Sequence, residues 1–335
     1  MQAEQVSQGV LVDHLSMLRA ARRPGYWISG RTKKATCAWR PDCWHSLMVS
    51  RPGRPIIVLG PERSGTSAWA EMIATWGAYA GEPDDLPAPD ELNPRGRWEY
   101  GPLWDLLEII GDFAEGVSWW EASFPRRVAA KATNPRLRSS AQALVGQMER
   151  HGQPWIWKDP ALCHFLPFWR QIWDDPLCVI TVRNPLDVAT SWQQFARLNG
   201  RRPTSVACNL LRWQYMIQSV LRETEEIPDR IFVEYERLVR QPSEQARRLA
   251  AFLDSHCGRD TGEIRITAMA NNCDPALWRN RASVNRTASE MAPAPTALYR
   301  MLRERAADVP GPADHSHPMP DGWRTLIINE ELASE

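Results

Sequence analysis

The feature that most constrains the fold is a short apolar run that leads through a glycine-containing turn into a helical pattern. Residues 54–60 (RPIIVLG) are rich in β-branched side chains, which predicts a buried strand. Residues 61–67 (PERSGTS) form a turn, and residues 68–76 (AWAEMIATW) have the apolar spacing of a helix. This order suits phosphate binding, because free N–H groups and the helix dipole both favour an anion. The sequence therefore predicts an anion site at residues 60–67.

Strands and helices continue to alternate along the chain. Further strands are predicted at 155–157, 177–182 and 231–233. Helical patterns cover residues 99–114, 136–150, a stretch up to about 172, a stretch from 185, 203–226 and 243–254. Such alternation implies a parallel sheet covered on both faces. We expect an α/β, three-layer fold with a central, mostly parallel sheet, helices on both faces and a P-loop-like nucleotide-binding core.

Charge and cysteine usage exclude several classes of function. Lys plus Arg and Asp plus Glu are equal at 40 each, whereas nucleic-acid binding normally shows as a basic surplus. The seven cysteines are odd in number and scattered, which indicates a reducing compartment. The chain shows no signal-peptide core and no apolar stretch near the roughly 18 residues that span a bilayer. We expect a cytoplasmic protein without a membrane span or a nucleic-acid partner, and its oligomeric state is unknown.

The turn differs from that of a nucleotide triphosphatase. It has the G-x4-G frame, but Thr66 stands where that motif requires lysine, and the basic side chain is Arg63, before Gly65. A kinase without the loop lysine loses its contact to the terminal phosphates. The alternative is an ordinary strand-turn-helix with Arg63 on the surface.

A second motif, VRNPLDVATSW, follows the strand at 177–182. Asn184 suits an N-cap, Pro185 suits the first helical position, and Asp187 completes a capping box. Arg183 at the strand end and Ser191 in the helix can therefore converge on one anion. The alternative is that Arg183 only pairs with Asp187.

Together the two motifs resemble those of sulfotransferases that use 3′-phosphoadenosine 5′-phosphosulfate (PAPS), and the resemblance covers roughly residues 54–254. In that family the first loop embraces the 5′-phosphate, and its basic residue contacts the bridging oxygen that leaves. Arginine occupies this place in the carbohydrate and tyrosyl-protein branches. An arginine and a serine in the second motif hold the 3′-phosphate. The resemblance thus implies cofactor binding by Arg63, Ser64, Gly65, Thr66, Ser67, Arg183 and Ser191.

Two later segments extend the implied cofactor site. Tyr235 lies in IFVEYERL, which resembles the segment that closes the family's core. By that resemblance Tyr235 is expected near the adenine, although a packing role suits it equally. Arg281, or else Arg279 or Arg286, is expected to supply a late contact to the 3′-phosphate.

The resemblance also assigns the chemistry. Sulfonate transfer is an in-line displacement at sulfur that needs a base on the acceptor side and cations on the donor side. We expect Arg63 and Lys158 to supply the positive charge without a metal, Lys158 lying in WIWKDP as a lysine does in several branches. The alternative for Lys158 is an exposed lysine at a strand end.

The expected base is Glu99. It lies in NPRGRWE, which resembles a segment of bacterial members that carries the base. His151 and His164 are rival bases outside any matching motif, and Glu99 is also placed to cap the next helix. Cys37, Cys43 and His45 fit no familiar zinc spacing, so we expect no metal.

These inferences predict a sulfotransferase that moves a sulfonate group from PAPS to a hydroxyl of a small-molecule acceptor and releases 3′-phosphoadenosine 5′-phosphate (PAP). The 17 tryptophans suit packing in the core. Alternatively, several of them, Trp98, Trp119 and Trp120, form the walls of an acceptor pocket. The acceptor would then be an aromatic natural product or a glycoconjugate. The alternatives are a P-loop small-molecule kinase and a catalytically inactive nucleotide-binding protein. The expected organisation is an N-terminal extension of unknown role at 1–50, a sulfotransferase domain at 51–306 and a C-terminal surface tail at 307–335.

Overall fold

The computed structural model describes residues 53–91, 93–281, 292–308 and 318–334. The chain divides into two units, residues 1–50 and 51–335, and the described residues all belong to the second. The expected N-terminal extension, with Cys37, Cys43 and His45, lies outside the described residues.

The centre of this unit is a four-stranded sheet whose neighbouring strands all run parallel, in the order β2-β1-β3-β4. The strands are β1 (Pro55–Leu59), β2 (Trp155–Lys158), β3 (Leu177–Val182) and β4 (Arg230–Glu234). Ile57 of β1 lies in register with Trp157 of β2 and Cys178 of β3. The expected parallel sheet is thus confirmed.

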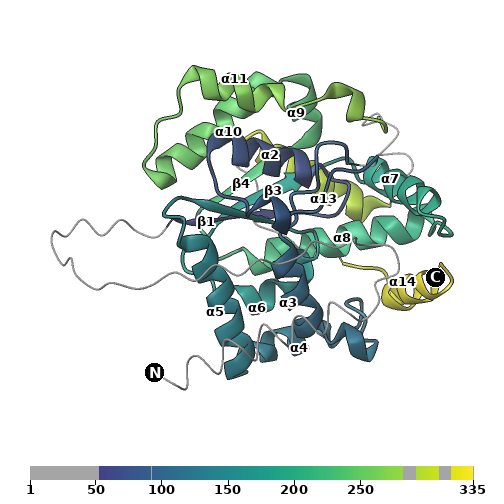
Figure 1. Ribbon diagram of the computed structural model, residues 1–335. Coiled ribbons are helices and arrows are strands. Elements are labelled where there is room, and N and C mark those ends of the chain that lie inside the picture. Colours follow the sequence, from purple (N-terminus) through teal and green to yellow (C-terminus); the bar gives the residue numbers. More distant parts are fainter. Residues whose placement is uncertain (1–52, 92, 282–291, 309–317, 335) are drawn as a thin grey trace. The chain divides into compact units, whose positions relative to one another are not determined.

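Side chains of each strand alternate between two apolar layers. In β1, Ile56 and Val58 pack in one layer, and Ile57 and Leu59 in the other. Figure 1 shows α2, α9, α10 and α11 over one face of the sheet and α3, α4, α5, α6 and α8 over the other. This arrangement confirms the expected three-layer α/β fold.

The helices differ from the predicted ones mainly in their ends and in five additional segments, α4, α9, α11, α13 and α14. Their bounds are α2 (Thr66–Trp76), α3 (Gly101–Gly111), α4 (Phe124–Lys131), α5 (Pro135–Glu149), α6 (Leu162–Trp169), α7 (Pro185–Leu198), α8 (Val206–Glu223), α9 (Tyr235–Arg240), α10 (Pro242–Cys257), α11 (Glu263–Asn271), α13 (Pro293–Ala306) and α14 (Trp323–Leu332). Short 3-10 turns lie at Pro83–Asp85, Phe113–Glu115 and Pro275–Leu277.

The end of the chain is not the surface tail that the sequence predicted. Helix α14 packs on α8 and buries Trp323 and Ile327. Glu331 accepts hydrogen bonds from Trp120 Nε1 at 2.7 Å and from Arg212 Nη2 at 2.6 Å. Only tertiary partners reveal this packing, because only two side chains of the helix are buried and its anchoring is polar.

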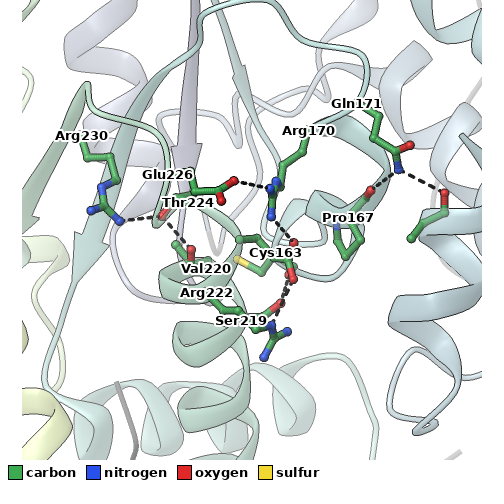
Figure 2. A network of polar contacts seen from close by, with 12 residues as sticks. Cys163, Pro167, Arg170, Gln171, Ser219, Val220, Arg222, Thr224, Glu226 and Arg230 are labelled. Atoms are coloured by element: carbon green, nitrogen blue, oxygen red, sulfur yellow. Dashed lines mark hydrogen bonds and ion pairs between the residues drawn. The ribbon is translucent and has the colours of Figure 1, made fainter. Parts of the chain in front are cut away.

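Helices α6 and α8 are joined by the network in Figure 2. Ser219 Oγ donates to the carbonyl oxygen of Cys163 at 2.8 Å, and Arg170 pairs with Glu223 at 3.1 Å and Glu226 at 3.0 Å. Since α6 begins just after β2, these contacts hold the segment that follows Lys158 against the body of the domain.

Candidate active site

One edge of the sheet gathers a residue of interest from every strand. Gly60 follows β1, Asp159 follows β2, Arg183 follows β3 and Tyr235 follows β4. The carboxyl ends of parallel strands all meet at this edge, which is where α/β proteins build their ligand sites. The sequence-predicted residues therefore converge because of the parallel order of the strands.

The turn after β1 has a compact backbone that its own residues stabilise. Arg63 and Gly65 adopt positive φ values of 65° and 89°. Ser64 donates its N–H and its hydroxyl to the carbonyl oxygen of Pro61, and its hydroxyl lies 2.8 Å from that of Thr181. The resemblance implied that Ser64 binds the cofactor, but both of its donors are used within the fold.

The first turn of α2 adds backbone N–H donors to the turn after β1. The N–H groups at a helix start have no intrahelical partner, so those of Thr66 and Ser67 are suited to a phosphate. The Thr66 side chain is buried, and Ser67 Oγ donates to the carbonyl oxygen of Arg97 at 3.2 Å. This contact ties the turn to the segment that carries Glu99.

Gly65 is the position where the turn tolerates no side chain. A Cβ there would lie 2.3 Å from Tyr235 Cδ2, in a left-handed backbone. We expect Gly65→Ala to destabilise the protein by about 2 kcal/mol or more, because strain and overlap add. Urea unfolding of the variant measures this loss. Gly146→Ala in α5, where a Cβ meets nothing within 4 Å, is the control, and it should be neutral or stabilising. Equal stabilities of the two variants would contradict the proposed packing of Tyr235.

The structure brings Arg63, Arg183, Ser191 and Tyr235 together. Arg63 Nε donates to Ser191 Oγ at 3.0 Å, and Arg183 Nη1 donates to the carbonyl oxygen of Arg63 at 2.7 Å. The Arg183 guanidinium lies over the Tyr235 ring, 4.5 Å from its centroid. Tyr235 thus packs beneath both Gly65 and Arg183, which accounts for its burial without contact to a ligand.

A cluster of arginines surrounds the turn. Burial first, and then the positive charges of Arg183, Arg279 and Arg97, lower the pKa of Arg63 to about 10. Arg63 is therefore still charged at neutral pH, but its charge is held in an unfavourable field. A guanidinium in the field of three others is suited to a ligand with several negative charges.

Sequence reasoning did not assign Arg97 to this cluster. Its guanidinium lies 5.9 Å from the centroid of the Phe195 ring, and that of Arg63 lies 5.7 Å from the same centroid. Arg97 also pairs with Asp90 at 2.6 Å. The available signal was its place in NPRGRWE, two residues before Glu99.

The late segment approaches Arg183 through Asn280. Arg183 Nη2 donates to the carbonyl oxygen of Asn280 at 3.5 Å. Arg281, the expected late contact, is exposed, stacks on Trp278 and donates to its carbonyl oxygen. Arg279 is the member of this segment whose charge acts on Arg63, and Arg286 lies outside the described residues.

The start of α7 sets the position of Arg183. The Asn184 side chain caps the helix by accepting from Leu186 N at 3.0 Å, and Pro185 takes the first helical position, as expected. The Asn184 N–H donates to Glu236 Oε1 at 2.9 Å. Burial raises the pKa of Glu236 to about 7. Helix α9 therefore shares in fixing this helix start, through a contact that the local motif did not predict.

Lys158 and Glu99 form an ion pair at the end of β2. Lys158 Nζ lies 2.7 Å from Glu99 Oε1, with the two side chains 3% and 27% exposed. The alternative of a solvent-exposed lysine is therefore wrong. Helix α3 begins at Gly101 without a side-chain cap, so the helix-capping role for Glu99 is wrong too.

Two more carboxyl groups accompany this ion pair, and sequence reasoning missed both. Asp159 is buried and Glu62, in the turn, is partly buried. Burial and then the charge of Glu99 raise the pKa of Asp159 to about 8. Burial also raises the pKa of Glu62, and Arg212 opposes that shift. Their positions next to Arg63 and Lys158 were the only available signals.

The two rival histidines occupy other environments. His164 is buried, its ring stacks 4.9 Å from that of Trp119, and burial lowers its pKa to about 3. His151 precedes β2, at the opposite end of the strand from Lys158, and stacks on Tyr79 with centroids 3.5 Å apart. Neither is placed to act as a base beside Lys158.

The tryptophans expected to wall a pocket are separated. Trp119 and Trp120 pack around His164 in one apolar layer, and Trp98 packs against the other. Trp120 is only 3% exposed. The core-packing alternative therefore describes Trp120, and the three rings do not share one wall.

Two further findings bear on the classes of function. Within the described ranges, no group of three or more His, Cys, Asp or Glu side chains is arranged to hold a metal ion. Among the described helices, none is both long and apolar enough to cross a membrane.

Known proteins resemble the part of the chain that contains the sheet and the candidate site. A profile of the sulfotransferase family matches residues 55–257. No curated protein sequence matches the chain. Among solved structures, the sulfotransferase domain from the curacin biosynthetic pathway is 16% identical with a TM-score of 0.41, covering 85% of this chain and 98% of its own. The sulfotransferase domain from the Synechococcus PCC 7002 olefin synthase is 19% identical with a TM-score of 0.35, covering 88% of this chain and 99% of its own. A mouse sulfotransferase complexed with PAP is 15% identical with a TM-score of 0.36, covering 84% of this chain and 90% of its own.

Proposed function

Since this chain belongs to the sulfotransferase family, we propose that it transfers a sulfonate group from PAPS to a hydroxyl of a small-molecule acceptor. The observation that carries the choice of donor is the arginine cluster around the turn. Arg63 lies in the field of three other guanidiniums, and the second motif contacts it directly. A donor with phosphate groups at both its 5′ and 3′ positions supplies the negative charge that this cluster requires.

The two ends of the donor have separate binding groups. The start of α2 and Arg63 would hold the 5′-phosphosulfate, because N–H groups and a cation meet there. Arg183 and Ser191 would hold the 3′-phosphate, since both reach the same side of the turn. Thr66 in place of the loop lysine disfavours a triphosphate at the same site.

The proposed transfer forms one bond to sulfur and breaks another. The acceptor oxygen attacks the sulfur, the bond from sulfur to the 5′-phosphate oxygen breaks, and PAP leaves. Arg63 stabilises the charge that grows on the departing oxygen, and Lys158 adds further positive charge on the donor side. Glu99, the more accessible member of its ion pair, takes the hydroxyl proton.

Donor specificity is the direct test of this proposal. The protein would be incubated with PAPS, and separately with ATP and Mg²⁺, against panels of phenols, sugars and alcohols. We expect sulfated product with PAPS only, detected by mass spectrometry. Phosphorylated product would favour the small-molecule kinase, and PAP binding without transfer to any acceptor would favour an inactive nucleotide-binding protein. The panel also tests the predicted preference for an aromatic natural product or a glycoconjugate.

A further inference from the structure

Arg97 and Arg63 lie against the same aromatic ring. Their guanidinium carbons lie 5.9 Å and 5.7 Å from the centroid of the Phe195 ring, within the range of a cation–π contact. Phe195 follows Ser191 by four residues in α7, so the two side chains share one helix face. Arg63 Nε donates to Ser191 Oγ at 3.0 Å. Arg63 and Arg97 therefore reach the same helix face from two separate segments of the chain.

The backbone around Arg97 is strained. Gly96 and Trp98, on either side of it, have φ values of 85° and 60°. A tryptophan in the left-handed region is costly and persists only where its surroundings hold it. Trp98 packs against the apolar layer that contains α2, and its Nε1 donates to the carbonyl oxygen of Arg95 at 3.1 Å. Ser67 Oγ donates to the carbonyl oxygen of Arg97 at 3.2 Å, which holds the strained segment against the start of α2.

Asp90 is the acidic partner of Arg97. Arg97 Nη2 lies 2.6 Å from Asp90 Oδ2, and the two side chains are 13% and 38% exposed. The other carboxylate oxygen, Oδ1, accepts a hydrogen bond from the N–H of Asn93 at 2.7 Å. An ion pair with so exposed a carboxylate contributes little to stability. An incoming anion can therefore take the place of Asp90 without a large loss to the fold.

The position of Arg97 along the proposed reaction indicates which anion this is. In an in-line transfer the sulfonate lies between the departing oxygen, which Arg63 contacts, and the acceptor oxygen, which Glu99 deprotonates. Arg97 lies beside Arg63 on the Phe195 ring, and Glu99 follows it by two residues. Arg183, by contrast, reaches the carbonyl oxygens of Arg63 and Asn280. Arg97 is therefore better placed for the sulfonate than for the 3′-phosphate.

We propose that Arg97 binds the sulfonate oxygens of PAPS, and that these oxygens take the place of the Asp90 carboxylate. This inference rests on the proposed function, since it assigns a residue to the group that is transferred. Arg97 then distinguishes the donor from the product PAP, which has no sulfonate. Once the sulfonate has moved to the acceptor, Arg97 returns to Asp90, and the product is held less tightly than the donor.

Arg97→Gln separates binding of the donor from binding of the product. We expect the affinity for PAPS to fall about 10-fold and that for PAP less than about 3-fold, measured by isothermal titration calorimetry without an acceptor. Arg95→Gln is the matched control, because Arg95 lies in the same segment but pairs with Glu71 at 2.6 Å. Both affinities should stay within about 2-fold in the control. Equal losses for the two ligands in Arg97→Gln, or no loss for either, would contradict the proposed role.

Asp90→Asn tests the exchange from the other side. Asparagine keeps an oxygen for the N–H of Asn93 but removes the charge that competes for Arg97. We expect the affinity for PAPS to rise about 3-fold and that for PAP to stay the same. In a double variant with Arg97→Gln, Asp90→Asn should have no further effect, because both changes act through one contact. An affinity for PAPS that stays the same or falls in Asp90→Asn would contradict the exchange.

These binding measurements fail separately from the donor experiment. A parent protein that transfers sulfonate, but whose Arg97→Gln variant loses PAPS and PAP equally, would keep the proposed function and overturn the role of Arg97. A parent protein that binds PAPS without transferring its sulfonate would overturn the function alone, because the two affinities need no acceptor. A parent protein that binds neither ligand would overturn both.

Discussion

Arg183→Ala is expected to weaken binding of PAP by about 100-fold, which corresponds to the loss of a well-buried, charge-assisted contact to the 3′-phosphate. Arg183 is only 6% exposed and lies between the Tyr235 ring and the carbonyl oxygen of Arg63. A guanidinium held in this way is already oriented for its ligand, so little conformational entropy is lost on binding.

The comparison ligand is AMP, which lacks the 3′-phosphate. Because Arg183 also supports the turn through Arg63, both ligands should lose some affinity, but AMP by less than about 5-fold. The ratio of the two losses, measured by isothermal titration calorimetry, isolates the 3′-phosphate. Equal losses for both ligands would remove this role from Arg183.

Arg281→Ala is the matched control. The resemblance assigned Arg281 to the same phosphate, but its side chain is exposed and stacks on Trp278. We expect PAP affinity to change less than about 3-fold, as is usual for an exposed charge. A loss as large as that of Arg183→Ala would restore Arg281 to the phosphate site.

The sequence was sufficient to predict the elements that position the site. The β-branched runs at β1 and β3 and the Asn184-Pro185 helix start are local signals, and the structure has them where they were expected. The carboxyl edge follows from these signals, because parallel strands align their ends. The convergence of Arg63, Arg183 and Ser191 was therefore predictable without knowledge of any contact.

Contacts between distant segments were not predictable in the same way. Glu99 and Lys158 were both assigned to the site, but nothing in their separate motifs indicates that they form an ion pair. Asp159 and Glu62 were missed for a related reason, since their significance is electrostatic and exists only when they surround Lys158. Charge clusters of this kind depend on tertiary geometry.

Helix α14, near the end of the chain, was missed because of its local composition. The segment before α14 has the Pro, His and Gly content of a surface loop, and this composition hid a helix whose Trp323 is buried against Tyr215. Hydrophobic periodicity is a weak guide when only two side chains of a helix are buried and its anchoring is polar.

Arg63→Met is expected to reduce the rate of sulfonate transfer by about 1000-fold at saturating PAPS, the scale seen when a stabilising donor is removed from a developing charge. The negative charge on the bridging oxygen appears only as its bond to sulfur breaks. The rate should therefore fall more than the affinity for PAPS. Single-turnover rates, with an acceptor from the panel, and equilibrium binding of PAPS separate the two losses. If PAPS affinity accounts for the whole loss, Arg63 binds the donor but does not assist the departure of PAP.

The same substitution should not destabilise the fold. Burial, and then the repulsion of Arg183, Arg279 and Arg97, lowers the pKa of Arg63 to about 10, so its charge is held at a cost to the fold. Methionine keeps an unbranched stem over the Phe195 ring and removes the charge, so the thermal midpoint of unfolding should stay equal or rise. Slower transfer combined with equal or greater stability is the result expected when a site tolerates unfavourable charge for the sake of its ligand. A lower midpoint would instead indicate that the bond from Arg63 to Ser191 stabilises the protein more than the repulsion destabilises it.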